Sequence, residues 1–427
     1  ISCSVVQGSG PYNEQVFFGN IPGISAISSI FINGNNEEVQ FNNTNPGSIG
    51  IINLIGTDYV TFKNLRVRSL NVSYGVGFIL TAGSDFNTID SCFIDISVTT
   101  GSGSAGIALT GTTSTSLTTT GINGSFNTFS NNIITGGSNG GPYYGMIIIP
   151  TNTNGTANNT TRVTNNTIRD FTVYGMYIMY SAGGVYRGNV MSRPTKASPT
   201  THYGIYMSSG MAQDTFDRNV VRQPFEMLQT STGTFYAYYA IATNIPTARP
   251  VIFSNNMMYN IRFNGTLYGF YQLSAQNFRL WNNTFVVDHP TSTATAVTYL
   301  YYNSGTPTTT TIRNNIFYLN RGGTGNKYAL YFATTGAGYV CNNNAFFMGN
   351  AGTNTFLGYY SANQLDLNAW KLVNSSAYDQ NSVQANPRFR SYINPDFYQP
   401  GADSLNNIGF ATPDVQFDFT GQPRSTT

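Results

Sequence analysis

A short pattern of apolar and polar positions recurs throughout the chain. It consists of an apolar residue, two variable residues, a pivot that is usually asparagine, one more variable residue and a second apolar residue, as in "TFSNNII" (128–134) and "TTTIRNNIFYL" (309–319). Ten copies align, and both flanking positions are apolar or aromatic in every copy. The pivots are Leu65, Cys92, Asn132, Asn166, Asn189, Asn219, Asn256, Asn283, Asn315 and Asn343. Self-similarity of this kind is typical of stacked-repeat proteins.

A second pattern precedes most copies and predicts a β-strand. It reads small residue, apolar, variable, apolar, as in "GFIL" (77–80), "YGMYIM" (174–179) and "YGIYM" (203–207). Alternation over so few residues, with many Ile, Tyr and Phe, is typical of strands. A helical period is found only in "ANQLDLNAWKLV" (362–373).

The distance between successive pivots varies from 23 to 40 residues, so the repeated object is a whole coil. A β-sandwich would instead show hairpins about every 8–12 residues. Two or three short strands per coil, joined by turns of variable length, predict an all-β fold, a right-handed parallel β-helix of about ten or more coils. In such a solenoid neighbouring coils lie about 4.8 Å apart and equivalent residues stack in ladders.

The asparagine pivots have a structural explanation. A sharp corner requires a residue that tolerates the left-handed backbone region, which Asn does better than other non-glycine residues. Stacked amides can also form hydrogen bonds from coil to coil. We therefore assign a structural role, at the corner between two inward-facing apolar residues, to Asn132, Asn166, Asn189, Asn219, Asn256, Asn283, Asn315 and Asn343.

The repeats suggest one continuous domain in three parts. Residues 1–50 contain strands without the pivot and form an irregular N-terminal cap. Residues 51–350 form the β-helix repeats, and residues 351–427 form the C-terminal coils and a capping segment that includes the expected helix. Caps are needed because the terminal coils of a solenoid expose unpaired strand edges.

Both ends of the chain resemble one known group of proteins. "SGPYNEQVFFGNIPGISAISSIFINGNNEEVQF" (9–41) is similar to the opening of secreted or cell-surface Bacteroidetes right-handed parallel β-helix repeat proteins. The closing stretch, which ends in "DFTGQPR" (418–424), resembles the end of the same group. The resemblance implies the β-helix fold, an extracellular or cell-surface location and export through the type IX pathway, with the secretion machinery as a partner.

The composition limits the kinds of partner that the chain can bind. Charged residues make up 9% of the chain and the net charge is +2, so no field attracts nucleic acid. The three cysteines, Cys3, Cys92 and Cys341, are far apart, and no metal-binding or cofactor motif is present. No apolar run is long enough to span a membrane. The 44 Gly and 29 Tyr, with many Asn and Thr, suggest an uncharged surface of the kind that is common outside cells.

The densest group of polar side chains lies between residues 187 and 226. Stacking of coils could bring His202 near Asp170 or Asp217 and so pair a base with a carboxyl group. Polygalacturonase-type signatures are absent, and acids do not recur at matching positions of neighbouring coils, as glycoside hydrolysis would need. The alternative is that these charges decorate long loops. We therefore expect no catalytic residue, and His202, Asp170 and Asp217 are the candidates for the enzymatic alternative.

Four tyrosines form a candidate ligand-binding stripe. Tyr177, Tyr206, Tyr271 and Tyr331 each stand two residues after the small residue of the second pattern. Strand alternation points them outward when their apolar neighbours point inward. An outward aromatic ladder could stack on sugar rings or dock another protein. The alternative is that it only stabilises the sheet or lies beneath a loop.

Three functions remain open. The first is a non-enzymatic extracellular structural or adhesive domain of a bacterial surface or secreted protein, with a polysaccharide or a cell-surface protein as partner. The second is a carbohydrate-active enzyme, a polysaccharide lyase or glycoside hydrolase, with its site around residues 170–226. The third is a glycan-binding module that uses the tyrosines. The lack of a catalytic signature favours the first.

Overall fold

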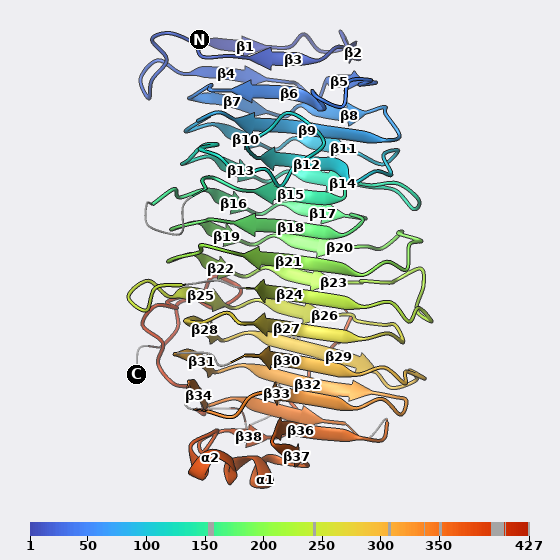
Figure 1. Ribbon diagram of the computed structural model, residues 1–427, viewed down its shortest axis with the longest axis vertical. Coiled ribbons are helices and arrows are strands. Elements are labelled where there is room, and N and C mark those ends of the chain that lie inside the picture. Colours follow the sequence, from blue (N-terminus) through green and yellow to red (C-terminus); the bar gives the residue numbers. More distant parts are fainter. Residues whose placement is uncertain are drawn as a thin grey trace. The chain divides into compact units, whose positions relative to one another are not determined.

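The computed structural model is a parallel β-helix, as the repeats predict (Figure 1). It describes residues 1–152, 158–241, 245–305, 309–336, 338–349, 352–393, 405 and 407–425. Each turn contributes one strand to each of three sheets, so hydrogen-bonded neighbours are generally three strands apart in sequence. Two compact units make up the chain, a first unit, Ile1–Asp214, and a second unit, Thr215–Thr427.

In the first unit, the first sheet consists of β1 (Ser2–Ser4), β4 (Ile30–Asn33), β7 (Val60–Lys63), β10 (Thr88–Asp90), β13 (Thr128–Ser130), β16 (Arg162–Thr164) and β19 (Val185–Arg187). The second sheet consists of β2 (Tyr12–Asn13), β5 (Glu38–Phe41), β8 (Arg66–Ser69), β11 (Phe93–Asp95), β14 (Ile133–Thr135), β17 (Thr167–Arg169) and β20 (Val190–Ser192). The third sheet consists of β3 (Val16–Phe18), β6 (Gly50–Ile55), β9 (Tyr74–Thr81), β12 (Gly103–Leu109), β15 (Tyr144–Ile148), β18 (Tyr174–Met179) and β21 (His202–Ser208).

In the second unit, the first sheet consists of β22 (Thr215–Asp217), β25 (Val251–Ser254), β28 (Phe278–Trp281), β31 (Thr310–Arg313) and β34 (Tyr339–Asn342). The second sheet consists of β23 (Val220–Arg222), β26 (Met257–Tyr259), β29 (Thr284–His289), β32 (Ile316–Arg321), β35 (Ala345–Met348) and β38 (Val383–Gln384). The third sheet consists of β24 (Phe235–Ile241), β27 (Leu267–Leu273), β30 (Thr298–Ser304), β33 (Lys327–Phe332), β36 (Thr355–Tyr360) and β37 (Ala362–Gln364). The last two of these strands pair antiparallel.

The core lies inside the coil, where equivalent apolar residues stack. Ile312 pairs with Leu280 in the preceding turn, Phe317 pairs with Phe285, and all four side chains are buried. Within each unit the third sheet runs leftward at the front of Figure 1, and the other two sheets return behind it as the chain descends. The turns are therefore right-handed, the hand that parallel strand connections prefer.

The pivots form a buried asparagine ladder at the corner between the first and second sheets. The Asn283 Oδ1 accepts hydrogen bonds from the backbone N and the Nδ2 of Asn256, at 2.9 and 3.1 Å. The Asn283 Nδ2 donates to the Phe253 carbonyl (2.9 Å) and to the Asn315 Oδ1 (3.0 Å). Each amide thus satisfies backbone groups of the preceding turn that the corner leaves unpaired. The same contacts place Asn132, Asn166, Asn189, Asn219 and Asn256 in this ladder.

Two details of the predicted corner are wrong. The last pivot is Asn344 and not Asn343, because the Asn344 Oδ1 accepts from the Asn315 backbone N (3.0 Å) and Cys341 pairs with Ile312. Three successive asparagines at 342–344 left the register ambiguous in the sequence. The left-handed backbone also belongs to the residue before the pivot, as at Asn131 (φ 57°) and Asn282 (φ 60°).

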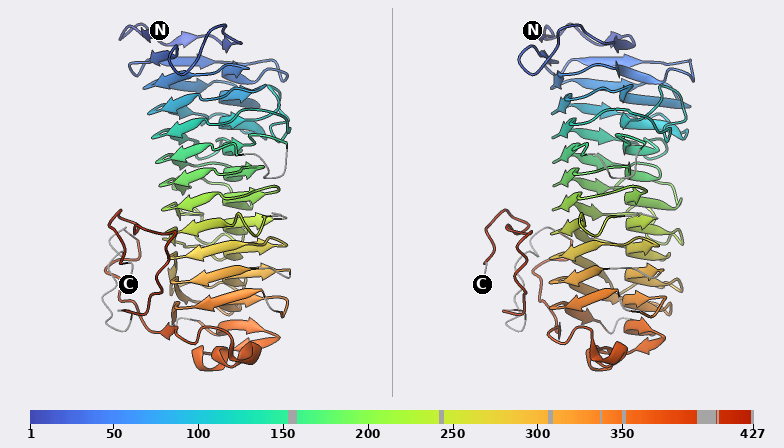
Figure 2. Two further views of the ribbon diagram at one scale, coloured as in Figure 1. Left: turned by 90° about the vertical axis from the view of Figure 1, so that its left-hand side faces the viewer. Right: turned by 60° about the vertical axis from the view of Figure 1, so that its left-hand side comes forward.

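The last coil of the second unit is closed by the helices α1 (Leu367–Lys371) and α2 (Val373–Ser376). The sequence predicted a helix from residue 362, but α1 begins only after Asp366, which caps it by accepting a hydrogen bond from the Ala369 N at 2.9 Å. Trp370 is fully buried and its indole packs against Gly358 in β36. Residues 407–425 of the C-terminal segment lie alongside the first sheet of this unit (Figure 2).

Candidate functional site

The outer face of the third sheet carries paired aromatic residues because its strands are kinked. Residues of a regular strand alternate between the two faces, yet β24, β27 and β30 each have two successive buried residues in the middle. The strand pairing skips Ala237, Gly269 and Leu300 at this point. Residues three apart, one on each side of the kink, therefore both face outward.

In the second unit these outward positions form two columns of aromatic rings, which we call the tyrosine strip. The first column is Tyr236, Tyr268, Tyr299, Tyr328 and Phe356, and the second is Tyr239, Tyr271, Tyr302, Tyr331 and Tyr359. Successive ring centroids are 4.7–5.5 Å apart in the first column and 4.5–5.1 Å apart in the second, with the rings stacked. Between the columns the rings meet edge to face at 4.8–5.1 Å.

This stacking decides which atoms of the strip reach solvent. Because each ring face is covered by the next ring, the outward surface consists of ring edges and hydroxyl groups. In the described part of the chain, no protein group accepts a hydrogen bond from the hydroxyl of Tyr271, Tyr302 or Tyr331, whereas Tyr328 donates to the Asn363 Oδ1 at 3.0 Å. Burial and the neighbouring tyrosines raise the pKa of Tyr302. The Tyr302 phenol is therefore a neutral hydrogen-bonding group.

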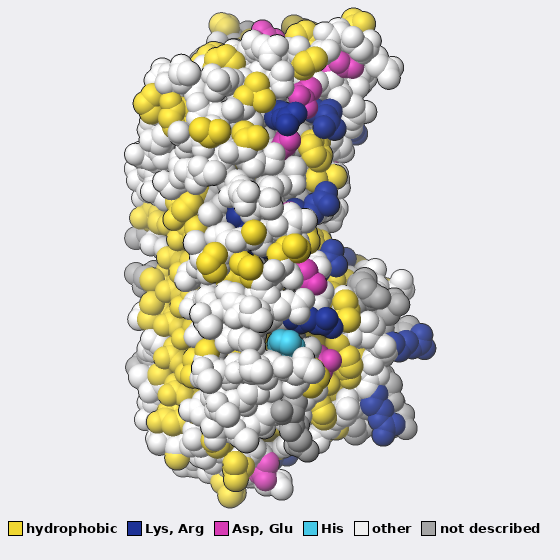
Figure 3. Space-filling view, turned by 90° about the vertical axis from the view of Figure 1, so that its right-hand side faces the viewer, with side chains coloured by type: hydrophobic (Ala, Val, Ile, Leu, Met, Phe, Trp, Pro, Cys, Tyr) yellow, Lys and Arg dark blue, Asp and Glu magenta, His cyan; other side chains and the backbone are white. Residues whose placement is uncertain are grey.

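The strip carries no exposed charge. Lys327 is the one charged residue in the sequences of β24, β27, β30, β33 and β36. It is 1% exposed, and its Nζ donates to the carbonyls of Gly323, Gly325 and Thr353 at 2.8–3.0 Å. The front of Figure 1 becomes the left edge of Figure 3, where a band of hydrophobic side chains runs without Lys, Arg, Asp or Glu in its lower part.

The first unit has a shorter version of this surface. Tyr174 and Tyr203 stack at 5.0 Å, and Tyr177 and Tyr206 stack at 4.9 Å. Gly175 permits the kink here, because a Cβ on it would lie 2.5 Å from the Gly204 carbonyl oxygen. In the earlier turns the same outward positions hold the fully buried residues Val76, Ile79, Ala105, Ala108 and Ile147, and also Tyr144, which is 9% exposed and stacks on Tyr174 at 5.2 Å.

A loop forms a roof over those aliphatic residues. Leu117 is 2% exposed and belongs to the same buried cluster as Ile79 and Ile147. The loop is held by hydrogen bonds from the Thr115 N to the Pro46 carbonyl (3.2 Å) and from the Thr110 Oγ1 to the Leu117 carbonyl (2.6 Å). The outer face of the third sheet is thus covered in these turns of the first unit.

All four tyrosines that the sequence singled out lie on the outer face of the third sheet. Tyr206, Tyr271 and Tyr331 are partly exposed, and Tyr177 is nearly buried between its neighbours. Sequence reasoning missed the first column, because strict alternation does not place residues i and i+3 on one face. The signal was present as a repeated Tyr-x-x-Tyr spacing at 174–177, 203–206, 236–239, 268–271, 299–302 and 328–331.

The histidine and the first acid of the enzymatic hypothesis lie in one buried network of the first unit. His202 is fully buried, and its Nδ1 accepts a hydrogen bond from the Arg193 Nη1 at 2.6 Å. Burial and the Arg193 charge hold the pKa of His202 well below its usual value. Asp170, 4% exposed, accepts from the backbone N (2.8 Å) and the Oγ1 (2.9 Å) of Thr195. Both residues therefore fix the loop after β20 and are shielded from solvent.

Asp217 belongs to the second unit, and its contacts are also with neighbouring protein groups. It is 5% exposed, and its Oδ1 accepts hydrogen bonds from the Ser254 Oγ (3.1 Å) and the Asn255 Nδ2 (2.8 Å). The Arg218 Nε lies 3.4 Å from its other oxygen. These contacts hold the corner after β22.

Metal sites and membrane-spanning helices were searched for as well. Among the described residues no group of three or more His, Cys, Asp or Glu side chains is placed to hold a metal ion. The helices in that part of the chain all lack the length and the hydrophobicity needed to cross a membrane. Cys3, Cys92 and Cys341 are free thiols.

Comparisons with known proteins give distant structural similarities. No family model and no curated protein matches the sequence. The structure is similar to an alginate lyase of family PL6, AlyGC, with a TM-score of 0.49 and 11% identity over 97% of this chain. It is also similar to the periplasmic alginate epimerase AlgG (TM-score 0.47, 14% identity, 82% of this chain and 74% of that one). A tailspike protein of the E. coli bacteriophage HK620 gives a TM-score of 0.40 with 11% identity, over 81% of this chain and 78% of that one.

The chain spans 55% of the length of the alginate lyase. At these identities and TM-scores the activities of the three proteins do not transfer to this chain. Function therefore has to be argued from the residues described above.

Proposed function

We propose that this chain is a non-enzymatic extracellular domain, structural or adhesive in role, whose tyrosine strip binds uncharged glycan. The single observation that carries the proposal is the strip itself, two columns of stacked rings on the outer face of β24, β27, β30, β33 and β36. A regular ladder of partly exposed aromatic rings without a charged neighbour is an interaction surface for a partner that is itself uncharged.

The exposed chemistry of the strip favours an oxygen-rich partner over an aliphatic one. An aromatic ring has a negative face and a positive edge, and in the stacked columns the edges point outward. Edges and phenol hydroxyls both attract electronegative oxygen atoms, such as the hydroxyl and ring oxygens of a sugar chain. Sugars would therefore lie across the ring edges. Stacking on a ring face, the more usual mode, is prevented by the neighbouring ring.

The non-enzymatic part of the proposal rests on the state of the candidate catalytic groups. General acid–base catalysis requires a titrating group within reach of a bound substrate. His202, Asp170 and Asp217 are instead buried, and each is hydrogen-bonded to neighbouring protein groups. The enzymatic alternative, a lyase or hydrolase with a site around residues 170–226, would need these groups to become exposed.

The location and origin of the chain are further parts of the proposal. The uncharged surface rich in Asn, Thr and Tyr supports an extracellular or cell-surface location. The resemblance of residues 9–41 and 418–424 supports an origin among secreted Bacteroidetes β-helix proteins, exported by type IX secretion machinery. A division into a cap (1–50), repeats (51–350) and C-terminal coils with a cap (351–427) belongs to the same proposal.

Affinity electrophoresis in gels that contain a neutral polysaccharide tests the proposal. We expect the wild-type chain to be retarded, and the Tyr271→Ser, Tyr302→Ser double variant to bind at least about tenfold more weakly, because aromatic contacts dominate such surfaces. Phe86→Ser is the matched control. Phe86 stacks between Tyr59 and Phe126 in the first unit, at 4.8 and 4.9 Å, outside the strip.

Unchanged retardation of the double variant, or a wild-type chain that is not retarded, contradicts glycan binding by the strip. The same polysaccharides, and polyuronides, should be incubated with the chain and assayed for new reducing ends and unsaturated products. Turnover that His202→Gln or Asp170→Asn abolishes would establish the enzymatic alternative.

A further inference from the structure

The second unit has another row of asparagines on its outside. The residue before each pivot is Asn255, Asn282, Asn314 or Asn343, with φ between 54° and 60°. In this conformation the side chain leaves the coil while the pivot beside it points inward. We call these four residues the outer asparagine row, and they occupy successive turns, about 4.8 Å apart.

The C-terminal segment 407–425, which we call the strap, lies along this row. The Asn343 Nδ2 donates to the Ile408 carbonyl (2.8 Å), and Asn314 exchanges two hydrogen bonds with the Phe410 backbone (2.7 and 2.8 Å). The Thr412 Oγ1 donates to the Asn282 Oδ1 (3.3 Å), and the Asn255 Nδ2 donates to the Phe417 carbonyl (3.0 Å). The strap is therefore fixed at four successive turns.

Two further contacts hold the strap. The Arg313 guanidinium lies 4.3 Å from the centroid of the Phe410 ring, and Arg279 forms an ion pair with Asp414. A cation over an aromatic face and a charge pair both add to the backbone contacts. The space between the strap and the outer asparagine row is thus bounded by two walls that are already in position.

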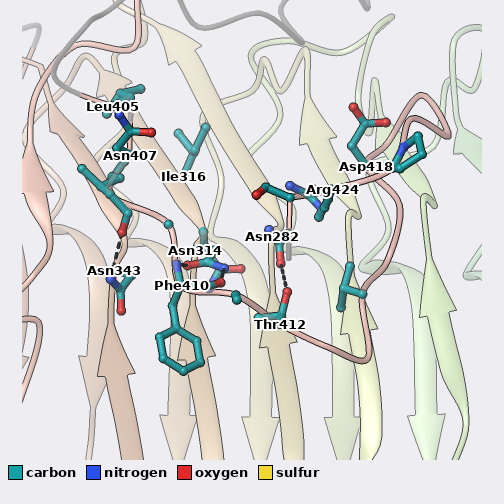
Figure 4. Close-up of a pocket in the computed structure, with 18 residues that line it drawn as sticks. Asn282, Asn314, Ile316, Asn343, Leu405, Asn407, Phe410, Thr412, Asp418 and Arg424 are labelled. Carbon is teal, nitrogen blue, oxygen red and sulfur yellow. Dashed lines mark hydrogen bonds between the residues drawn. The ribbon is translucent and has the colours of Figure 1, made fainter. Parts of the chain in front are cut away.

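That space is a pocket of about 480 Å³, which we call the strap pocket (Figure 4). Its volume falls in the range of small-molecule sites, about 300–1,000 Å³. Figure 4 shows Asn282, Asn314 and Asn343 along one wall, with Asn407 and Arg424 on the strap. The inner wall is amide-rich because the left-handed corner favours Asn at each turn.

The amides of the row keep hydrogen-bonding capacity for a ligand. Asn282 uses its Oδ1 on the strap and Asn343 uses its Nδ2. Within the described residues, the Asn282 Nδ2 and the Asn343 Oδ1 have no protein partner, so one wall offers a donor and an acceptor two turns apart. Both amide atoms of Asn314 are engaged by Phe410. Asn407 contributes a third amide from the strap side.

The pocket is close to neutral and has some apolar surface. The Arg424 Nη2 donates to the Asn255 Oδ1 at 2.7 Å, and the lining contains one carboxylate, Asp418, in addition to this guanidinium. Ile316, Leu405 and Val415 supply aliphatic carbon to the lining. Amides beside a few aliphatic groups match the alternation of hydroxyl and C–H groups on a sugar ring, because a hydroxyl both donates and accepts.

We propose that the strap pocket binds a neutral, hydroxyl-rich ligand of one or two sugar units, independently of the tyrosine strip. The Asn282 Nδ2 and the Asn343 Oδ1 contact its hydroxyls, and Ile316 packs against a C–H face. An acidic sugar is disfavoured because the lining contains the carboxylate of Asp418 in addition to the guanidinium of Arg424.

Isothermal titration calorimetry of the full chain with cellobiose, maltose and digalacturonic acid tests the site. We expect binding of a neutral disaccharide, and an affinity at least about tenfold lower in the Asn282→Gly, Asn343→Gly double variant, since two hydrogen bonds are lost. Glycine keeps the positive φ of both positions. Asn165→Gly, at the same corner of the first unit (φ 58°), should leave the affinity unchanged.

A second control separates ligand contacts from strap attachment. Asn314→Gly removes two hydrogen bonds to the strap, but it removes no amide atom that is available to the ligand. The affinity for the disaccharide should therefore fall by less than about threefold. An equal loss in Asn314→Gly and in the double variant would overturn the assigned contacts. Failure of all three disaccharides to bind, or preferred binding of digalacturonic acid, would overturn the proposal.

The two proposals fail separately. Tyr271→Ser with Tyr302→Ser should leave disaccharide titration unchanged while it weakens polysaccharide retention. Loss of disaccharide binding in that variant would mean that the ligand lies on the strip and not in the strap pocket.

Discussion

The outer face of the third sheet is built in two ways within one chain. In the early turns of the first unit its outward positions are small or aliphatic, with the exception of Tyr144, and the loop around Leu117 packs over them. In the second unit the corresponding positions of the Tyr-x-x-Tyr spacing are tyrosines, and all of them except Tyr328 remain partly exposed. The same backbone therefore presents either an internal second layer or an external surface.

The two faces differ because exposure to water has a different free energy for aliphatic and for tyrosine side chains. An aliphatic face of this size in contact with water is unfavourable by about 25 cal/mol per Å², so it requires a roof. A tyrosine stacked on both faces already buries most of its carbon, and its hydroxyl remains hydrated. The tyrosine strip can thus stay open without a covering loop, which makes it available to a partner.

Introducing a charge at equivalent positions should separate the two faces most strongly. Ile147→Asp places a carboxylate beneath the roof, so we expect a loss of about 3–5 kcal/mol in the free energy of unfolding, or failure to fold. Tyr302→Asp at the open face should lose only about 1–1.5 kcal/mol, mainly from ring stacking. Urea unfolding followed by circular dichroism measures both. Equal losses would show that the strip is as buried as the roofed face.

Weakening the roof should have the next largest effect. Leu117→Ala leaves a cavity over Ile79 and Ile147, and we expect a loss of about 2–4 kcal/mol in the free energy of unfolding. Binding of a hydrophobic dye to the folded variant should increase, because the aliphatic layer becomes accessible. Thr118→Ala, at the exposed neighbouring position, is the control and should change neither quantity. A stable Leu117→Ala chain would mean that the roof contributes little.

Most of the fold could be predicted because it depends on periodic burial. The apolar flanks of each pivot alternate with polar residues, and that alternation is enough to give parallel coils and an inward asparagine ladder. The position of the left-handed residue could not be read in the same way. Two adjacent asparagines, such as Asn282 and Asn283, are equally suited to the corner, and only the packing decides which one points inward.

The candidate site was harder to predict from sequence. The kink at Gly269 and Leu300 breaks the alternation, so the first tyrosine column looked like ordinary strand sequence. The strap pocket was missed because it joins Asn282 and Asn343 with residues near 424, and no local pattern encodes such a contact. His202 was a candidate only for the enzymatic alternative, and its burial and its contact with Arg193 could not be seen in the sequence.

Each unit has a buried arginine at the carboxyl end of a second-sheet strand, Arg193 directly after β20 and Arg321 as the last residue of β32, but only the first unit adds a buried histidine. The Arg193 Nε donates to the Phe171 carbonyl at 3.0 Å, and the Arg321 Nη2 donates to the carbonyls of Phe263 and Gly265 at 2.7 and 2.8 Å. His202 accepts from Arg193, so it must stay neutral on that nitrogen. Acid should therefore weaken the first unit first.

The direction in which stability changes with pH follows from the depressed pKa of His202. In the unfolded chain this histidine takes up a proton near pH 6.5, whereas in the folded chain it does not, so stability falls as the pH drops through 6.5. Between pH 6.5 and 5.5 we expect a loss of about 1 kcal/mol. Hydrogen exchange should show the loss in β18 and β21, and His202→Gln should remove it. An unchanged pH dependence in that variant would refute the assignment. His289→Gln is the control. Burial lowers the pKa of this partly exposed histidine of the second unit as well, so this variant should leave the loss in β18 and β21 unchanged.

The smallest expected effect comes from a variant that tests whether the hydroxyls or the ring edges of the strip bind the glycan. Tyr302→Phe keeps the ring and its stacking against Tyr271 and Tyr331, so the free energy of unfolding should change by less than about 0.5 kcal/mol. If the hydroxyl contacts sugar oxygens, retention on a neutral polysaccharide should fall by about three- to tenfold, which is the loss of one hydrogen bond. Retention equal to that of the wild type would leave the ring edges as the binding groups. In that case Tyr302→Ser should lose the retention that Tyr302→Phe keeps, because a serine cannot replace the edge that the stacked phenyl ring presents.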